Sequence, residues 1–325
     1  MHEVMNQLSG FPSGHLLVVD NGSSDDTLKY LNELTASETR VSLAQEAISG
    51  TYYARARAIE QATGDFLIFL DDDAVPRPGW LNAMLTALLS APDVGAVGCS
   101  IEPIWEGPRP PWLSQRLLRE IPVYEVAADF SPARFPSFPP AIALGIRLNG
   151  CARLWVSKER RTSYPLGRKG SLADGANFQM VAGEDNDLCE IYARNGYRVM
   201  FTNSTRVGHA VPKERLVPEW FLKKFRSEGY LRIRLSRLTG RPAVNWHSIK
   251  MLVLLPAFAV LQPVRSALSL ATGLLVHAYY LKCVGAWQEL LWGERLKPLP
   301  YEAIGRTDSP PGSEGASSER GEATT

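Results

Sequence analysis

The sequence predicts an α/β protein with a mostly parallel, Rossmann-like sheet that has helices on both faces. Short apolar runs alternate with helical patterns over the first hundred residues, as they do where a helix links one parallel strand to the next. Two of these runs, 15–20 and 66–73, end in aspartates. Ligands of such folds bind at the carboxyl ends of the strands, so we expect these aspartates to lie at one site.

The amino-terminal half supplies most of the expected elements. Residues 1–8 are typical of the tail of a helix. Strands are expected at 15–20, 41–44, 66–70 and 94–101, because these runs are short, apolar and bounded by turn residues. Helices are expected from 25, over 52–62 and over 80–90, where apolar residues recur at helical spacing.

The following residues change in composition. Residues 103–140 contain nine prolines and are expected to be irregular and to lie over the surface. A strand is expected at 150–157 and a polar turn at 167–170. A helix should begin at the acidic group after Gly183 and stop at Asn195-Gly196, before a last strand at 197–202.

The junction at 66–73 carries the clearest chemical signal. Five apolar residues lead directly into Asp71, Asp72 and Asp73. Side chains alternate along a strand, so Asp71 and Asp73 should share one face while Asp72 points away. Two such carboxylates suit Mg²⁺ or Mn²⁺, which complete their coordination with water and substrate phosphate. By itself the pattern is equally typical of a solvated acidic loop.

Composition excludes several classes of protein. A hydrophobic content of 45% is sufficient for a large core, and a net charge of +1 gives no preference for nucleic acid. The four cysteines are scattered without a paired motif, so neither a zinc site nor a disulfide framework is indicated. We expect a reducing, cytoplasmic setting, and the first residues do not have the pattern of a signal peptide.

Five motifs in order support a closer resemblance. They are Val18-Val19-Asp20-Asn21-Gly22-Ser23-Ser24-Asp25-Asp26-Thr27, Ala54-Arg55 before Thr63-Gly64-Asp65, Asp71-Asp72-Asp73, Glu184-Asp185, and Val207-Gly208-His209 with Arg215 six residues later. This series resembles family 2 glycosyltransferases of the GT-A fold, which use nucleotide-sugar donors and invert the anomeric carbon. The match covers roughly residues 16–230.

The resemblance implies a role for each matched residue. Asp185 would be the catalytic base, and Asp71, Asp73 and His209 would hold Mn²⁺ or Mg²⁺. The donor would be bound by Asp20, Asn21, Arg55, Asp71, Asp72, Arg168 and Arg215. Lys169 could add charge near the diphosphate. The partners would be a nucleotide sugar and a glycan, lipid-linked or other hydroxyl acceptor.

The chain departs from the family pattern at two places. Ala56 stands where an asparagine is usual, which removes a polar contact near the donor. The family's first strand should precede Leu16 by about 30 residues at ordinary strand-helix-strand spacing, so that strand is expected to be missing from these residues.

The carboxyl-terminal third is expected to be a separate helical region. We assign 1–217 to the catalytic domain, 218–305 to a helical, membrane-associated region and 306–325 to a disordered tail. Residues 220–238 mix basic and apolar side chains, which suits either a helix on anionic lipid or a solvated face over a packed stripe. The apolar runs 251–264 and 267–281 are shorter than the ~20 residues of a span. The expected location is the cytoplasmic face of a membrane.

Two alternative functions remain open at this point. An apolar strand that ends in Asp71-x-Asp73 also resembles a haloacid dehalogenase-type phosphatase, in which Asp71 would be the nucleophile. The other alternative is a membrane-attached family member that has lost catalytic activity.

Overall fold

A computed structural model describes residues 1–118, 121, 123–134, 137–161, 183–241, 253–254, 256–257, 259–261 and 270–292. Its strands are β1 (Leu16–Asp20), β2 (Val41–Gln45), β3 (Phe66–Leu70), β4 (Ala74–Pro76), β5 (Val94–Trp105), β6 (Ser131–Pro132), β7 (Ala143–Arg147) and β8 (Arg198–Val211). They form a two-stranded sheet, β1-β2, and a six-stranded sheet of order β3-β7-β5-β8-β4, in which β6 also pairs with β8.

The larger sheet is mixed, so the expectation of a mostly parallel sheet is wrong. Strands β1 and β2 are parallel, as are β5 and β8, but β3-β7, β5-β7, β4-β8 and β6-β8 are antiparallel. The cause is the segment between β5 and β7, which returns the chain to the sheet in the opposite direction. Strands alternate with helical connections only as far as β5, so the expectation of parallel neighbours does not hold beyond it.

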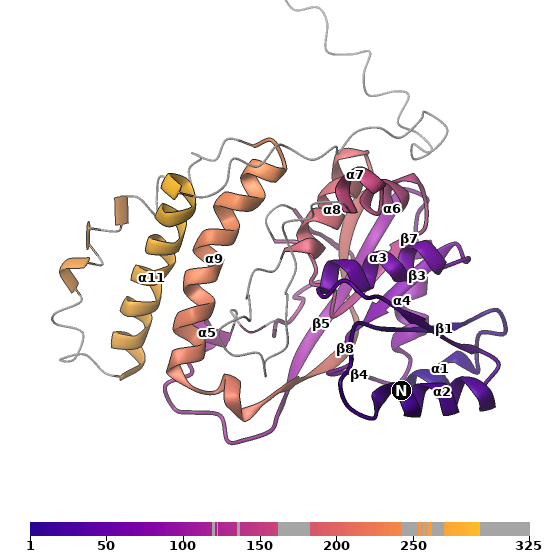
Figure 1. Cartoon of the computed structure of the whole chain (residues 1–325). Helices are drawn as coiled ribbons and strands as arrows, with labels where there is room; N and C mark the ends of the chain where they lie inside the picture. Colours follow the sequence, from indigo (N-terminus) through magenta and orange to yellow (C-terminus); the bar gives the residue numbers. More distant parts are fainter. Residues whose placement is uncertain are drawn as a thin grey trace, which may run out of the picture.

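Helices cover both faces of the sheet, as expected (Figure 1). One face is packed by α3 (Thr51–Gln61), α6 (Gly150–Trp155) and α8 (Glu184–Arg194), and the other by α4 (Trp80–Leu89). Within β7, Leu144 belongs to the first core cluster and its neighbour Ala143 to the second. Both faces of β7 are therefore buried, which explains why its sequence is apolar up to Arg147.

Most of the expected helices are present, and one expected strand is wrong. Helices α1 (His2–Leu8), α2 (Thr27–Ser37), α3, α4 and α8 lie where the sequence places them. Residues 150–157, expected as a strand, instead contain helix α6. The side chain of Asn149 accepts a hydrogen bond from the Cys151 amide at 2.9 Å and so caps this helix, and the strand is β7, just before it.

The expected irregular segment is shorter than 103–140. Strand β5 continues to Trp105, and a short helix, α5 (Gln115–Leu118), and β6 follow. Strand β8 also extends well beyond the expected 197–202. The expected turn at 167–170 and the tail at 306–325 lie outside the described residues.

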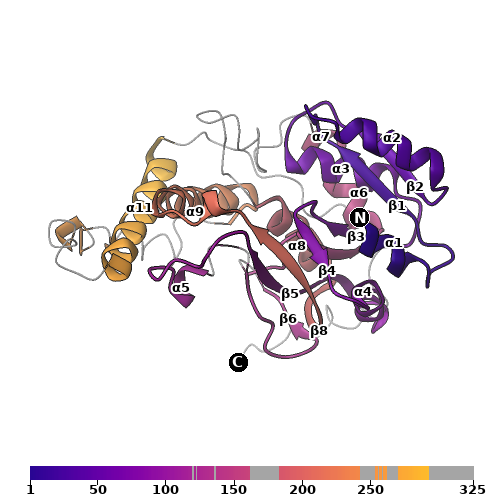
Figure 2. The ribbon, with the colours of Figure 1, turned by 90° about the horizontal axis from the view of Figure 1, so that it is seen from below.

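The described part of the carboxyl-terminal region contains two long helices. Helices α9 (Pro218–Leu238) and α11 (Leu270–Trp292) lie side by side at one end of the molecule in both ribbon views (Figures 1 and 2). Together with α5 they form a third core cluster that includes Phe221, Phe225 and Ala278. Among the described residues, no helix combines the length and the apolar character needed to cross a membrane.

Candidate functional site

The end of β3 and the end of β8 bring together three predicted residues. The Ala210 amide donates a hydrogen bond to the Asp73 carbonyl at 2.8 Å, which fixes the chain after β3 beside β8. As a result Asp73 Oδ2 lies 3.3 Å from His209 Nε2 and 3.6 Å from Arg215 Nη2. His209 and Arg215 are buried, whereas the Asp73 side chain is 34% exposed.

Asp73 and His209 are suitable ligands for a hard divalent ion. Adjacent ligands of an octahedral ion with bonds of about 2.1 Å lie roughly 3 Å apart, close to the separation of Asp73 Oδ2 and His209 Nε2. The described residues contain no group of three or more His, Cys, Asp or Glu side chains that could hold a metal. An ion here would therefore take its other ligands from water and substrate phosphate, as Mg²⁺ and Mn²⁺ usually do.

Asp71 has a different partner from Asp73. Its Oδ1 accepts a hydrogen bond from Arg55 Nη2 at 2.8 Å, and Arg55 Nη1 lies 2.5 Å from Glu184 Oε1. Thr51 also donates to Glu184 Oε1, at 2.7 Å. Burial opposes the charge on Arg55, but Asp71 and Glu184 outweigh it and raise the pKa of the guanidinium. Arg55 thus ties the end of β3 to the first turn of α8. Asp72 is exposed.

Asp185 sits in the first turn of α8, next to Glu184. Its Oδ1 accepts hydrogen bonds from the amide and the side chain of Asn186, at 2.7 and 3.1 Å. Burial and the neighbouring charge of Glu184 raise the pKa of Asp185 to about 6, although Arg55 and Asn186 act in the opposite direction. A carboxyl group with this pKa is well suited to accept a proton near neutral pH.

A glycine allows α8 to begin where it does. Gly183 has φ of +110°, and a Cβ built on it would lie 2.8 Å from Leu231 Cδ1 on α9. A larger residue would be strained at this φ, and the Leu231 side chain would have to shift to make room for it.

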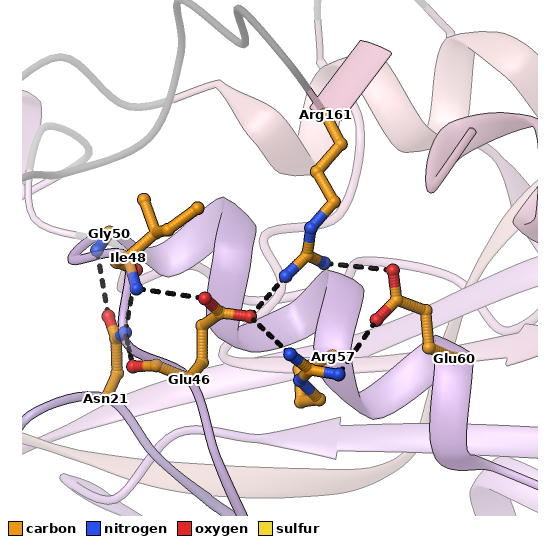
Figure 3. Close-up of polar contacts among 7 residues, drawn as sticks. All are labelled: Asn21, Glu46, Ile48, Gly50, Arg57, Glu60 and Arg161. Carbon is orange, nitrogen blue, oxygen red and sulfur yellow. Dashed lines mark hydrogen bonds and ion pairs between the residues drawn. The ribbon is translucent and has the colours of Figure 1, made fainter. Parts of the chain in front are cut away.

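The predicted donor residues Asp20 and Asn21 shape the turn after β1. Asp20 is buried, and its two carboxylate oxygens accept hydrogen bonds from the amides of Gly22 and Ser23, both at 3.2 Å. Asn21 binds the loop after β2 through three hydrogen bonds: its Nδ2 donates to the carbonyls of Glu46 and Ile48, and its Oδ1 accepts from the Gly50 amide (Figure 3). Both side chains therefore fix the two loops at the carboxyl ends of β1 and β2.

Next to this loop lies a charged network that the sequence did not predict. Glu46 is buried and accepts hydrogen bonds from the Ile48 amide and from Arg161 of α7 (Lys158–Arg161) (Figure 3). Arg57 lies 3.4 Å from both Glu46 and Glu60, and Arg161 Nη1 lies 2.9 Å from Glu60. Burial raises the pKa of Glu46, but the hydrogen bonds from the Ile48 amide and Arg161 lower it by more, so the pKa lies below its usual value.

A surface hollow of about 510 Å³ adjoins this network. Its lining includes Ile48, Tyr53 and Arg161 but none of Asp73, His209 and Asp185. Two of the predicted basic residues, Arg168 and Lys169, lie outside the described part of the chain, so their position relative to Asp73 stays a prediction.

Comparison with known proteins shows which families and structures this chain resembles. Residues 1–146 match the family model described as glycosyl transferase family 2. The chain is 21% identical over 216 residues to a glucosyl-dolichyl phosphate glucuronosyltransferase of Haloferax volcanii, covering 66% of this chain and 65% of the relative. It is 38% identical over 88 residues to glycosyltransferase AglE of the same organism, covering 27% of this chain and 29% of AglE. The chain thus spans less than two thirds of the length of either relative.

A solved structure shares the fold. The mannosyltransferase PcManGT from Pyrobaculum calidifontis, in complex with GDP-Man and Mn²⁺, superposes with a TM-score of 0.53 at 18% identity, covering 90% of this chain and 84% of the other. The α/β, GT-A-like fold expected from the motifs is confirmed. Neither the phosphatase nor the inactive family member is favoured.

Proposed function

Since residues 1–146 match the family model described as glycosyl transferase family 2, we propose that this chain is a glycosyltransferase acting on a nucleotide-sugar donor and an acceptor hydroxyl. The observation that carries the proposal is the meeting of Asp73, His209 and Arg215 at the strand ends. The motif order identified these residues from positions far apart in the chain. Such a group of one carboxylate, one imidazole and one guanidinium suits a divalent ion and a diphosphate.

The reaction is a single displacement. The acceptor oxygen forms a bond to the anomeric carbon while the bond from that carbon to the diphosphate oxygen breaks, which inverts the configuration. The acceptor proton passes to Asp185, whose raised pKa suits a general base. Arg215 places a positive charge beside the departing phosphate. Mn²⁺ or Mg²⁺ bound by Asp73 and His209 would neutralise the diphosphate leaving group.

The remaining donor roles follow the strand ends. Asp20 and Asn21 would shape one side of the nucleoside pocket, because they hold the loops after β1 and β2 in place. Arg55 would keep Asp71 oriented toward the donor, with the exposed Asp72 beside it. Arg168 would add a further donor contact.

The acceptor is proposed to be a glycan, a lipid-linked glycan or another hydroxyl compound at the cytoplasmic face of a membrane. The name of one Haloferax relative includes a dolichyl phosphate, which is a lipid carrier. The apolar carboxyl-terminal runs also favour work at a membrane surface.

Donor binding tests the proposal. We expect UDP- or GDP-sugars with Mn²⁺ to stabilise the protein in a thermal-shift panel, by about 2.7 kcal/mol at 100 times Kd. In calorimetric titration the binding should require Mn²⁺ and be lost in Asp73→Ala. Asp65→Ala is the matched control, because Asp65 is an exposed residue just before the opposite end of β3. Equal binding with and without the metal, or in Asp73→Ala, would count against the proposal.

A further inference from the structure

Asn186 directly follows the proposed base, Asp185, and holds one oxygen of its carboxylate. The backbone amide of Asn186 and its side-chain Nδ2 both donate hydrogen bonds to Asp185 Oδ1, at 2.7 and 3.1 Å. Within the described part of the chain, no hydrogen bond reaches Asp185 Oδ2. Oδ2 is therefore the oxygen that is left to take a proton from the acceptor hydroxyl.

The amide oxygen of Asn186 lacks a hydrogen-bond donor. A carboxylate can only accept hydrogen bonds, so the amide group must turn Nδ2 toward Asp185 and Oδ1 away from it. This Oδ1 is covered from solvent and meets no donor among the described residues. Leaving a buried acceptor unpaired costs stability, and native proteins keep few such groups without a functional reason. A hydroxyl group of a ligand would supply the missing donor.

A second unpaired polar atom lies within electrostatic reach of Asp185. Tyr124 is fixed by two backbone hydrogen bonds with Ile101, at 2.9 and 3.0 Å, and by an edge contact with the ring of Phe201, at 5.5 Å between centroids. Its hydroxyl is buried and has no hydrogen-bond partner in the part of the chain that the structure describes. Burial, and after it Cys99 and Asp185, raise the pKa of this phenol. The Tyr124 hydroxyl therefore keeps its proton and can donate it in a hydrogen bond.

The chemistry of these atoms indicates what kind of acceptor they fit. Asp185 Oδ2 and Asn186 Oδ1 are both hydrogen-bond acceptors, so a ligand that pairs with both must bring two donors. The two donors must lie near each other, because one amide group carries both Asn186 Oδ1 and the Nδ2 that contacts Asp185. Hydroxyl groups on neighbouring carbons of a sugar ring meet this requirement. An ionised phosphate does not, because its oxygens only accept.

We propose that Asn186 is an acceptor-binding residue that selects a sugar with two neighbouring hydroxyl groups. The reacting hydroxyl passes its proton to Asp185 Oδ2, and its neighbour donates a hydrogen bond to Asn186 Oδ1. The Tyr124 hydroxyl donates to another oxygen of the same sugar. Asp185 and Asn186 are both partly exposed, so neither residue is shut off from a ligand. The inference rests on the proposed function and deepens it, because it names the class of acceptor.

A double-mutant cycle of protein and acceptor tests this inference. The donor is the UDP- or GDP-sugar that binds with Mn²⁺, the acceptors are methyl glucoside, methyl galactoside and methyl mannoside, and kcat/KM is measured from the release of UDP or GDP. A monodeoxy analogue without the hydroxyl next to the reacting one should lower kcat/KM at least about tenfold in the wild type. The same analogue should lower it less than about twofold in Asn186→Ala, which has already lost the contact.

Two further variants accompany the cycle. Asn82→Ala is the matched control and should behave like the wild type, because Asn82 is exposed on α4, which packs against the other face of the sheet. Tyr124→Phe keeps the ring and its contact with Phe201 but removes the hydroxyl, so kcat/KM for the parent glycoside should fall about tenfold. Circular dichroism checks that each variant is folded.

The remaining outcomes separate this inference from the proposed function. An equal loss for the deoxy analogue in the wild type and in Asn186→Ala would overturn the inference, because Asn186 Oδ1 would then make no contact with the acceptor. So would nucleotide release that none of the three glycosides stimulates, including the case in which decaprenyl phosphate does. Calorimetric titration should give the same donor Kd for the wild type and Asn186→Ala. If the wild type binds no donor, the proposed function fails; if it binds a donor but the cycle shows no coupling, only this inference fails.

Discussion

Replacing Asp187 by leucine should cost far more stability than breaking any surface ion pair. Asp187 of α8 and Arg160 of α7 are both fully buried, and Arg160 Nη2 lies 2.5 Å from Asp187 Oδ2. The same carboxylate oxygen accepts a hydrogen bond from Trp155 Nε1 at 2.9 Å. Tyr52 of α3 in turn donates to the Trp155 carbonyl at 3.0 Å. One carboxylate thus joins the helices that position Asp185.

The expected magnitude follows from burial. Asp187→Leu leaves the Arg160 guanidinium in the core without its carboxylate, and removing one partner of a buried ion pair costs about 3–5 kcal/mol. At roughly 2 °C per kcal/mol for a chain of this size, the melting temperature should fall by about 6–10 °C. The double variant Arg160→Met/Asp187→Leu removes both charges, and the indole N–H of Trp155 loses its hydrogen bond to Asp187, at a cost of about 1–3 kcal/mol.

Differential scanning calorimetry of the single and double variants measures these differences. The matched control is Asp93→Leu, because Asp93 binds Arg198 through two hydrogen bonds of 2.7 Å but both side chains are more than one third exposed. Such a surface pair contributes about 1 kcal/mol or less. The reasoning is refuted if Asp187→Leu costs no more than Asp93→Leu, or if the double variant is less stable than the single.

Two further predictions concern the base and the helix pair. Asp185→Asn should lower transfer by about 10²–10⁴ with donor Kd unchanged, and wild-type turnover should fall below pH 6, where Asp185 becomes protonated. The pKa of Asp185 is raised in the folded protein, so this carboxyl group contributes to stability below its pKa in the unfolded chain, and the contribution is lost as pH rises through about 6. At pH 8, Asp185→Asn should therefore have a higher melting temperature than the wild type. An unchanged melting curve would contradict this. Gly229→Ala should force α9 and α11 apart, because its Cβ would lie 1.8 Å from the Lys282 carbonyl oxygen, and should lower the melting temperature. Ser227→Ala, on the same helix, is the comparison, and an equal melting temperature for both variants would contradict this.

The sequence predicts those parts of the site that depend on strand ends and motif order. Asp73 and His209 are brought together because β4 follows directly after the aspartates and pairs with β8, with Ala74 opposite His209. Apolar runs mark such strands reliably, since the strands are buried on both faces. Glu46 and Arg161 are different, because 115 residues separate them and neither belongs to a periodic pattern. Only the tertiary fold brings them together.

The strands of the larger sheet differ in direction from the sequence-based expectation, and the difference has a specific cause. The rule that strands alternating with helices run parallel depends on every connection being a helical crossover. From β5 to β7 the connection instead contains the proline-rich segment, and β7 enters between β3 and β5 antiparallel to both. Proline content predicted the irregular segment, but it carries no information about the direction in which the chain returns to the sheet.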